Sequence, residues 1–429
     1  MTGNHDPYEA LKYPEYRNYI LARLLLTLGT LMQATIVGWQ VYDITRGPFS
    51  LGLIGLAEAI PSILIALYAG HVTDTRNRKY VLLFSYGLML FCAASLLIIS
   101  TDYIITPKAN KLIAIYSVIF ISGIARGFSM PSAFAFMAQL IPPRTFPNAI
   151  TWNTSTWQVG AITGPAIGGF VYGFFGISVS YTVVTLLVLA AVILLSLIEK
   201  KPVPVITEEQ TLSERLSAGI KFVFSNKIIL SAISLDMFAV LFGGATAMLP
   251  VYSADILFSG PQGLGMLRAA PSVGAVFMAL YMTRKPPLKK TGMKLFFCVL
   301  GFGVSIIVFA VSKNFYLSLL MLALSGMFDN VSVVIRATTI QLSTPDNMKG
   351  RVSSVNSIFI GSSNEIGAFE SGLAAKLMGV VPSVVFGGIM TLLVVISVFY
   401  LSPGLRRLEL SRSSPLREGI SAMNGNLPE

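Results

Sequence analysis

Acidic and basic residues occur inside long apolar segments of this sequence, where ionisable side chains are rare. The stretch GSSNEIGAFESG, which begins at Gly361, carries Glu365 and Glu370. A charged side chain in the core of a bilayer is costly, so it faces a polar cavity or a partner and marks a functional site. A carboxyl group that is shielded from water can bind a proton and release it when water reaches the site. These residues therefore indicate proton or ion handling inside a membrane.

The ionisable residues away from the ends of the apolar segments are Arg23, Glu58, Arg126, Asp236, Arg268, Asp329, Arg336, Glu365, Glu370 and Lys376. Arg126, Asp329 and Glu365 lie near the middle of their segments, where a long side chain does not reach the membrane surface. We predict that Glu365 or Asp329 is the proton-coupling site. The full set of proton-coupling candidates is Glu365, Asp329, Asp236, Glu370 and Glu58, and the substrate-cavity candidates are Arg126, Arg336 and Arg268. The alternative left open is that Glu365 and Asp329 are each held in a permanent ion pair with Arg126 or Arg336.

The composition predicts that membrane-spanning helices position these residues. Of the 429 residues, 54% are hydrophobic and 12% are charged, and the mean hydropathy is +0.72. A soluble chain carries about 25% charged residues, so we predict an all-α integral membrane protein. Apolar runs of about 20 residues, the length of a membrane-crossing helix, recur along the chain. The twelve predicted helices lie at 17–42, 51–72, 80–101, 111–138, 148–173, 178–198, 228–252, 261–283, 294–312, 315–343, 351–378 and 382–402.

Basic residues are distributed unevenly among the loops, and this predicts the orientation of the chain. The loops on one side of the predicted helices hold only Arg46, Lys108, Lys111 and Lys313, whereas the other loops and both tails are rich in Lys and Arg. Because basic loops stay in the cytoplasm, we expect both termini there and the chain in the cell (inner) membrane. The net charge of +11 is then a topology signal, and a nucleic-acid partner is not needed to explain it.

The chain divides into two related halves. VYDITRGPFSLGLIGLAEAIPS, from Val41, aligns without a gap with VYSADILFSGPQGLGMLRAAPS, from Val251, and NAITWNTSTWQVGAITGPAIGG, from Asn148, aligns with RVSSVNSIFIGSSNEIGAFESG, from Arg351. Two parallel six-helix repeats are typical of a large class of secondary transporters. We therefore predict two pseudo-symmetric six-helix bundles. The predicted divisions are an N-terminal bundle at 1–199, a cytoplasmic linker at 200–227, a C-terminal bundle at 228–403 and a cytoplasmic tail at 404–429.

The repeat also aligns residues of opposite charge. Glu58 aligns with Arg268, and Asp329 occupies roughly the position that Arg126 has in the first half. We therefore expect opposite charges to face each other across the pseudo-twofold axis.

The linker contains a predicted amphipathic helix. Thr211 and Glu214 have the spacing of a capping box, and Leu212, Leu216, Ile220 and Val223 follow at helical period. We expect this helix to lie on the cytoplasmic face of the membrane, with a partly ordered linker as the alternative.

Two motifs suit close packing of helices. GHVTDTRNRKYVLL, from Gly70, combines a small residue with an Asp, an Arg and a Lys that can form charge-assisted bonds with a neighbouring helix end. GAITGPAIGG, from Gly160, has small residues four apart and a proline that bends the helix. The first resembles the loop signature GxxxDxxxRK of the major facilitator superfamily, and its key positions are Gly70, Asp74, Arg78 and Lys79. The second resembles the GxxxGPxxGG motif of that superfamily's exporters and antiporters, and its helix-packing residues are Gly160, Gly164, Pro165, Gly168 and Gly169.

The resemblance to the superfamily covers essentially the whole chain. SLDMFAVLFGGATAMLPVYS, from Ser234, and the segment from Ile335 to Gly372 resemble the enterobactin-exporter group, which includes macrolide efflux proteins. This resemblance implies a rocker-switch exporter of a small molecule, siderophore-like or an amphiphilic drug, driven by proton antiport. It also implies that the loop motif acts as a conformational latch. The alternatives are a broad macrolide or multidrug efflux pump, a proton-coupled uptake symporter and a non-transporting membrane receptor.

An enzymatic role is not expected from this sequence. It contains two histidines, no metal-ligand cluster, no nucleophile–base constellation and no GxxxxGK[ST] phosphate loop. We therefore predict no cofactor and no metal. The expected partners are a small-molecule substrate, protons and the lipid bilayer, and we expect a monomer.

Overall fold

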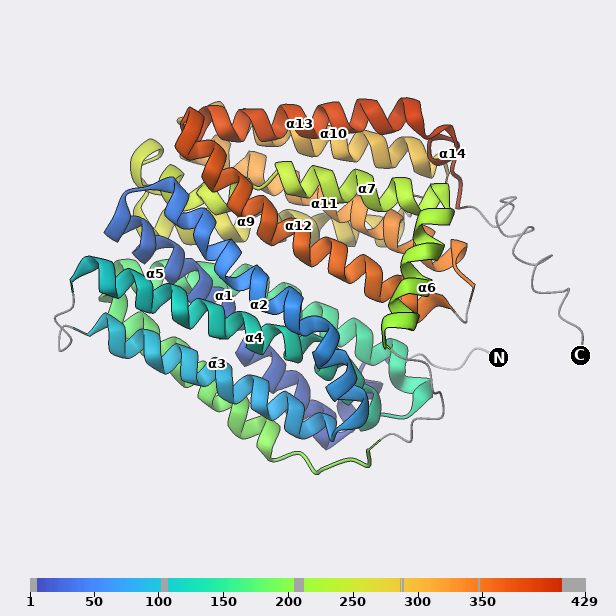
Figure 1. The fold of residues 1–429 in the computed structure, drawn as a ribbon, viewed down its shortest axis with the longest axis horizontal. Helices are drawn as coiled ribbons and strands as arrows, with labels where there is room; N and C mark the ends of the chain where they lie inside the picture. Colours follow the sequence, from blue (N-terminus) through green and yellow to red (C-terminus); the bar gives the residue numbers. More distant parts are fainter. Residues whose placement is uncertain are drawn as a thin grey trace, which may run out of the picture. The chain divides into compact units, whose positions relative to one another are not determined.

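A computed structural model describes residues 6–101, 107–203, 212–285, 287, 289–345 and 348–410. Every regular element in these ranges is helical, which confirms the predicted all-α class (Figure 1). The long helices are α1 (Pro14–Thr45), α2 (Pro48–Thr75), α3 (Arg78–Ser100), α4 (Lys108–Leu140), α5 (Phe146–Ser196), α7 (Lys227–Phe242), α9 (Gly260–Arg284), α10 (Thr291–Val311), α11 (Phe315–Ser343), α12 (Lys349–Met378) and α13 (Val380–Leu401). The shorter ones are η1 (Glu9–Lys12), η2 (Pro143–Thr145), α6 (Leu212–Ser225), η3 (Ala245–Met248), α8 (Leu249–Val251), η4 (Tyr252–Ile256) and α14 (Pro403–Arg406).

Ten helical stretches of the described chain are long and apolar enough to cross a membrane. One of them contains α5, whose 51 residues include a break at Gly176, where φ is 80° and ψ is −179°. At 1.5 Å per residue, α5 would extend about 77 Å, more than twice the roughly 30 Å of a hydrocarbon core. It therefore supplies two crossings. Helix α12 is long enough to cross as well, but it carries charged residues that lower its hydropathy. The expected number of twelve crossings includes α12 and counts α5 twice.

The single helix predicted at 228–252 is interrupted in the structure, so that prediction was wrong. Helix α7 ends at Phe242, and after Gly243 and Gly244 the chain continues through the short turns η3, α8 and η4. A Cβ atom on Gly243 would lie 2.6 Å from the ring of Phe302, and one on Gly244 would lie 2.7 Å from the Ser371 hydroxyl. The two glycines therefore permit an approach to α10 and α12 that side chains would block, and an apolar window average does not detect this.

The helices gather into two compact units. The first contains Met1–Glu209 and Leu249–Ala269, and the second contains Gln210–Met248 and Ala270–Glu429. Segment Leu249–Ala269, although it follows α7 in sequence, thus packs with the first unit. The predicted domain boundaries follow the sequence repeat instead and stay a prediction.

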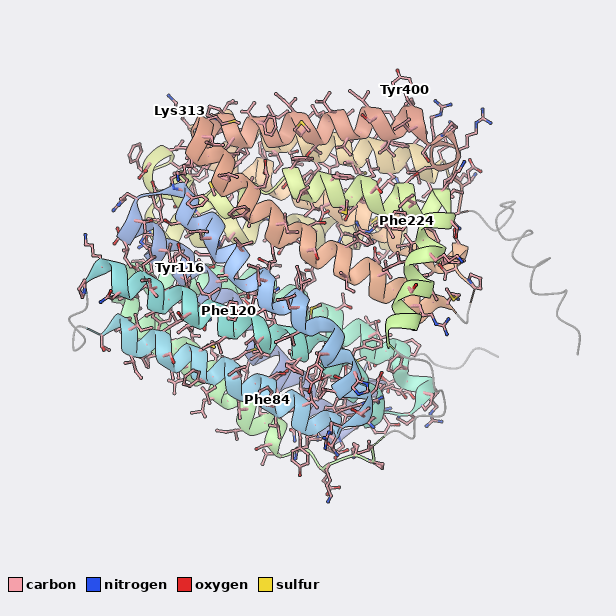
Figure 2. All side chains as sticks on the ribbon, viewed as in Figure 1. Phe84, Tyr116, Phe120, Phe224, Lys313 and Tyr400 are labelled. Atoms are coloured by element: carbon pink, nitrogen blue, oxygen red, sulfur yellow. The ribbon has the colours of Figure 1, made fainter. Side chains whose placement is uncertain are left out.

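Exposed aromatic and aliphatic side chains cover the outer sides of the helices. Phe84 on α3 and Phe120 on α4 are exposed in the first unit, and Tyr400 on α13 is exposed in the second (Figure 2). Exposed apolar surface of this extent requires an apolar surrounding, which agrees with a multi-pass membrane protein.

The chain before α1 folds onto the start of α5. The Asn148 side chain accepts a hydrogen bond from the Ala10 amide (3.0 Å) and donates one to the Pro7 carbonyl (2.9 Å). The indole N–H of Trp152 also donates to Pro7 (3.0 Å), and its ring lies against Tyr8. We call residues 6–13 the N-terminal arm.

Candidate functional site

A buried polar cluster lies between α7 and α11 in the second unit. Asp236 of α7 and Arg336 of α11 form an ion pair, and both residues are at most 5% exposed. The Ser332 hydroxyl contacts the other carboxylate oxygen of Asp236 at 3.5 Å. A buried charge is tolerated when an opposite charge and hydrogen bonds compensate it. The charge of Arg336 is thus neutralised within the second unit.

A second carboxylate, Asp329, borders the same cluster. Ser332 and Arg336 follow Asp329 after three and seven residues, which places all three on one face of α11. A small cavity of about 10 Å³, close to the space that one water needs, is lined by Asp236, Ser332, Asp329, Ala239, Val240, Val299, Phe302 and Phe328. In the described part of the chain, Asp329 forms no ion pair. The cluster therefore holds two carboxylates and a single guanidinium.

Helix caps and close crossings fix the position of this cluster. The Asn226 side chain accepts from the amides of Ile228 and Ile229 (3.1 Å each) at the start of α7, and Asn314 accepts from Leu317 (3.1 Å) at the start of α11. Gly326 of α11 packs directly on the backbone of α9 at Pro271. Because a Cβ atom at Gly326 would collide with that backbone, this glycine sets the depth at which the following turn, with Asp329, is placed.

The first unit contains its own intramembrane ion pair. Arg126 of α4 contacts Glu58 of α2 at 2.7 Å, with side-chain exposures of 46% and 22%. A Cβ atom on Gly123 would meet the backbone of Glu58, so the glycine brings α4 close enough for this pair to form. Arg126 is therefore accompanied by a carboxylate of its own unit, but it is far more exposed than Arg336.

Arg268 of α9 lies against α1 in the first unit. A Cβ atom on Gly38 would be 3.1 Å from its guanidinium Nη2, and its buried Nε has no hydrogen-bond partner. Among the described residues, no carboxylate forms an ion pair with Arg268. The remaining two candidates, Glu365 and Glu370, both lie partly buried on α12.

Comparison with known proteins identifies the family. The family model for transmembrane secretion effectors of the major facilitator superfamily matches residues 6–419. The chain belongs to this family. It is 24% identical over 403 residues to the enterobactin exporter EntS of Shigella flexneri, covering 92% of this chain and 93% of the relative. The EntS protein of Escherichia coli O1:K1 / APEC is 23% identical over 401 residues, with the same coverage.

Solved structures of transporters share the fold. The POT family transporter PepTSo matches with a TM-score of 0.72 and 13% identity over 92% of this chain and 99% of that structure. A bacterial homologue of the human lysosomal transporter Spinster has a TM-score of 0.71 and 14% identity, and the match covers 94% of this chain and 99% of that structure. A D-xylose–proton symporter has a TM-score of 0.71 and 13% identity, with coverages of 93% and 100%. At these identities the likeness concerns the fold alone, and it confirms the predicted major facilitator architecture.

The glycine motif of this transporter has two packing faces on α5. Cβ atoms on Gly160, Gly164 and Gly168 would lie 2.6–3.1 Å from side-chain or backbone atoms of α1, between Thr27 and Met32. One on Gly169 would lie 2.8 Å from the Cα of Gly265 on α9. Helix α5 is therefore in close backbone contact with α1 along one face and with the start of α9 along another.

The loop motif binds helix ends within the first unit. Gly70 and Asp74 lie in the last turns of α2, and Arg78 and Lys79 begin α3. Arg78 donates to the Ala135 carbonyl of α4 (3.1 Å), and Lys79 donates to the carbonyl of Ser196, the last residue of α5 (2.9 Å). The contact of Lys79 is at the C-terminus of α5, where a cation is favourable because the terminal carbonyls carry partial negative charge, whereas Ala135 lies before the last turn of α4. Asp74 forms no ion pair with the residues that the structure describes.

Sequence reasoning did not single out a polar cluster at the end of α1. The Tyr42 hydroxyl donates to the Asp255 carboxylate of η4, and Arg46 contacts Asp255 at 3.8 Å and Asp43 at 2.7 Å. Ser332 was missed as well. The repeat alignment relates 41–46 to 251–256 as equivalent positions, which does not predict a contact between them, and a serine in an apolar helix gives no signal either.

Proposed function

We propose that this protein exports a small molecule from the cytoplasm in exchange for protons, by alternating access of a central site. Membership of the secretion-effector family and the likeness to enterobactin exporters support transport and efflux. The observation that carries the proton-coupled part is the cluster with two carboxylates and one guanidinium around a small cavity.

Charge balance assigns different roles to the two carboxylates. Asp236 is the permanent partner of Arg336, so it stays charged through the transport cycle. Asp329 has no such partner among the described residues, and a carboxylate without compensation is unfavourable away from water. Asp329 therefore takes up a proton when the cavity is closed to water and releases it when water enters. Because the proton then binds better to one of the two conformations, proton binding shifts the population between them.

The substrate is an anionic, siderophore-like compound in this proposal. The relatives are named as enterobactin exporters. Arg126 is about half exposed although it is paired with Glu58, and the guanidinium of Arg268 pairs with no carboxylate of the described residues. These two side chains are the cations that recognise the negative groups. Broad efflux of amphiphilic drugs is the competing function, and transport of uncharged macrolides would favour it.

The loop motif completes the proposed cycle. Arg78 binds a carbonyl of α4 and Lys79 binds the last carbonyl of α5, while Asp74 is left to bind a helix end when the cytoplasmic side closes. Both termini lie in the cytoplasm, and the monomer is the transporting unit in the inner membrane.

Transport into vesicles with an imposed pH gradient tests the proposal. Purified protein reconstituted in liposomes should move a catecholate siderophore faster with the gradient than without it. The Asp329→Asn variant should still exchange substrate for substrate at equal pH, but it should lose acceleration by the gradient. Equal acceleration of the variant and the natural protein would refute the role of Asp329. Absence of any substrate flux in the natural protein would refute export of that compound.

A further inference from the structure

Helix α6 takes a different course from the other helices of its unit. Figure 1 shows it lying across the ends of α7 and α12 instead of alongside them. Both of these helices begin at that end, with Lys227 and Lys349 as their first residues. Because α7 is a membrane-crossing helix, a helix that lies across its end runs along the membrane surface.

The inner face of α6 is fixed to α12. A Cβ atom on Gly219 would lie 2.9 Å from the Arg351 carbonyl oxygen, so α6 approaches the α12 backbone closely. One turn further on, Val223 is fully buried in a cluster that includes Val352 and Val355. The orientation of α6 about its own axis is thus determined by packing, and its outer face is determined with it.

The exposed part of α6, here called its outer face, is amphipathic, with Ile220 and Phe224 about 100° and Lys221 and Ser225 about 160° around the helix axis from the buried Gly219 and Val223. Ile220 and Phe224, one turn apart, are 44% and 57% exposed, and Figure 2 labels Phe224 on this helix. Lys221 and Ser225 follow these two residues directly and are exposed on the adjoining flank, since successive helical residues are about 100° apart. Lys227 is exposed at the start of α7. Apolar side chains beside lysines form the pattern of helices that insert at the boundary between headgroups and acyl chains.

We propose that the outer face of α6 is a binding surface for anionic phospholipid, in which Ile220 and Phe224 insert into the bilayer interface and Lys221 and Lys227 contact the phosphate groups. The surface is next to a membrane-crossing helix, so the bilayer is within its reach, and its two lysines complement negative headgroups. This inference does not depend on the transported compound or on proton coupling.

Spin labels on two adjacent residues test the insertion. Cysteine is introduced as Phe224→Cys or Ser225→Cys in the full chain with Cys92 and Cys298 replaced by alanine, and each protein is placed in nanodiscs. In discs of phosphatidylcholine and phosphatidylglycerol in equal parts, oxygen should relax the label at 224 more strongly than a water-soluble nickel chelate does. The label at 225 should show the reverse. Preference for the chelate at both positions would overturn the proposal and would point to a soluble partner.

Lysine substitutions test the headgroup specificity. Lys221→Gln should weaken binding of phosphatidylglycerol to the purified protein about fivefold, the usual contribution of one lysine near an anionic surface. Lys285→Gln removes an exposed lysine from the end of α9 instead and serves as the matched control. It should weaken the binding of phosphatidylglycerol less than Lys221→Gln does. Equal weakening in both variants, or none in either, would overturn the assignment of the lipid to α6.

Discussion

The two aspartates of the cluster should differ sharply in what their removal does to stability. Asp236→Asn removes the partner of Arg336, which is 4% exposed and would then be a buried charge without compensation. Breaking a buried ion pair on one side destabilises a protein by about 3–5 kcal/mol. Asp329→Asn breaks no ion pair of the described residues, and an amide has nearly the shape of a protonated carboxyl group. Its cost should be about 1 kcal/mol or less.

Unfolding of the purified variants in mixed micelles of increasing denaturing detergent measures this difference. A third variant, Asp236→Leu with Arg336→Met, removes both charges and should be more stable than Asp236→Asn, because no unpaired charge is left behind. If Asp329→Asn and Asp236→Asn cost the same, Asp329 must also be engaged in a permanent ion pair. The assignment of Asp329 as the proton-binding carboxylate would then be refuted, whatever the transport assay showed.

Further predictions concern packing and the two polar contacts at the helix ends. Gly169→Ala should destabilise the protein by about 1–3 kcal/mol because the new Cβ atom would lie 2.8 Å from the Cα of Gly265. The control Gly87→Ala, whose Cβ atom would have no neighbour within 4 Å, should be neutral or stabilising by up to about 1 kcal/mol. Equal melting temperatures of the two variants would contradict the close crossing of α5 and α9. Asn148→Ala removes both hydrogen bonds of this side chain to the N-terminal arm, so added protease should cleave the arm faster than in the control variant Thr151→Ala. Equal cleavage rates in the two variants would show that other contacts hold the arm. Tyr42→Phe removes the hydroxyl that donates to Asp255 and should lower the free energy of unfolding by about 1 kcal/mol. Tyr116→Phe removes a tyrosine hydrogen bond to the Ser50 carbonyl, away from that cluster, and serves as the control. An unchanged stability of Tyr42→Phe would show that Asp255 does not help to hold η4.

The sequence predicted the helical fold because apolar length is a local property. The interruption after α7 was not predicted, since Gly243 and Gly244 matter through their distance to α10 and α12, which no window along the chain records. Likewise, the intramembrane charges were found from composition, but their pairing was not. Glu58 was aligned with Arg268 by the repeat, and the structure pairs it with Arg126 of its own unit. Sequence symmetry relates equivalent positions, whereas an ion pair requires two helices to be neighbours.

This pairing has a consequence for how protons are linked to movement. Glu58–Arg126 lies within the first unit and Asp236–Arg336 within the second, so the proposed alternating-access cycle does not require either pair to break. A group couples proton binding to a conformational change only if its proton affinity differs between the conformations, and a partner that is kept in both reduces that difference. Coupling requires a titratable group whose surroundings change. In the proposed cycle Asp329 meets that requirement, since it lines the small cavity and forms no ion pair among the described residues, and opening of this cavity to water would change its proton affinity.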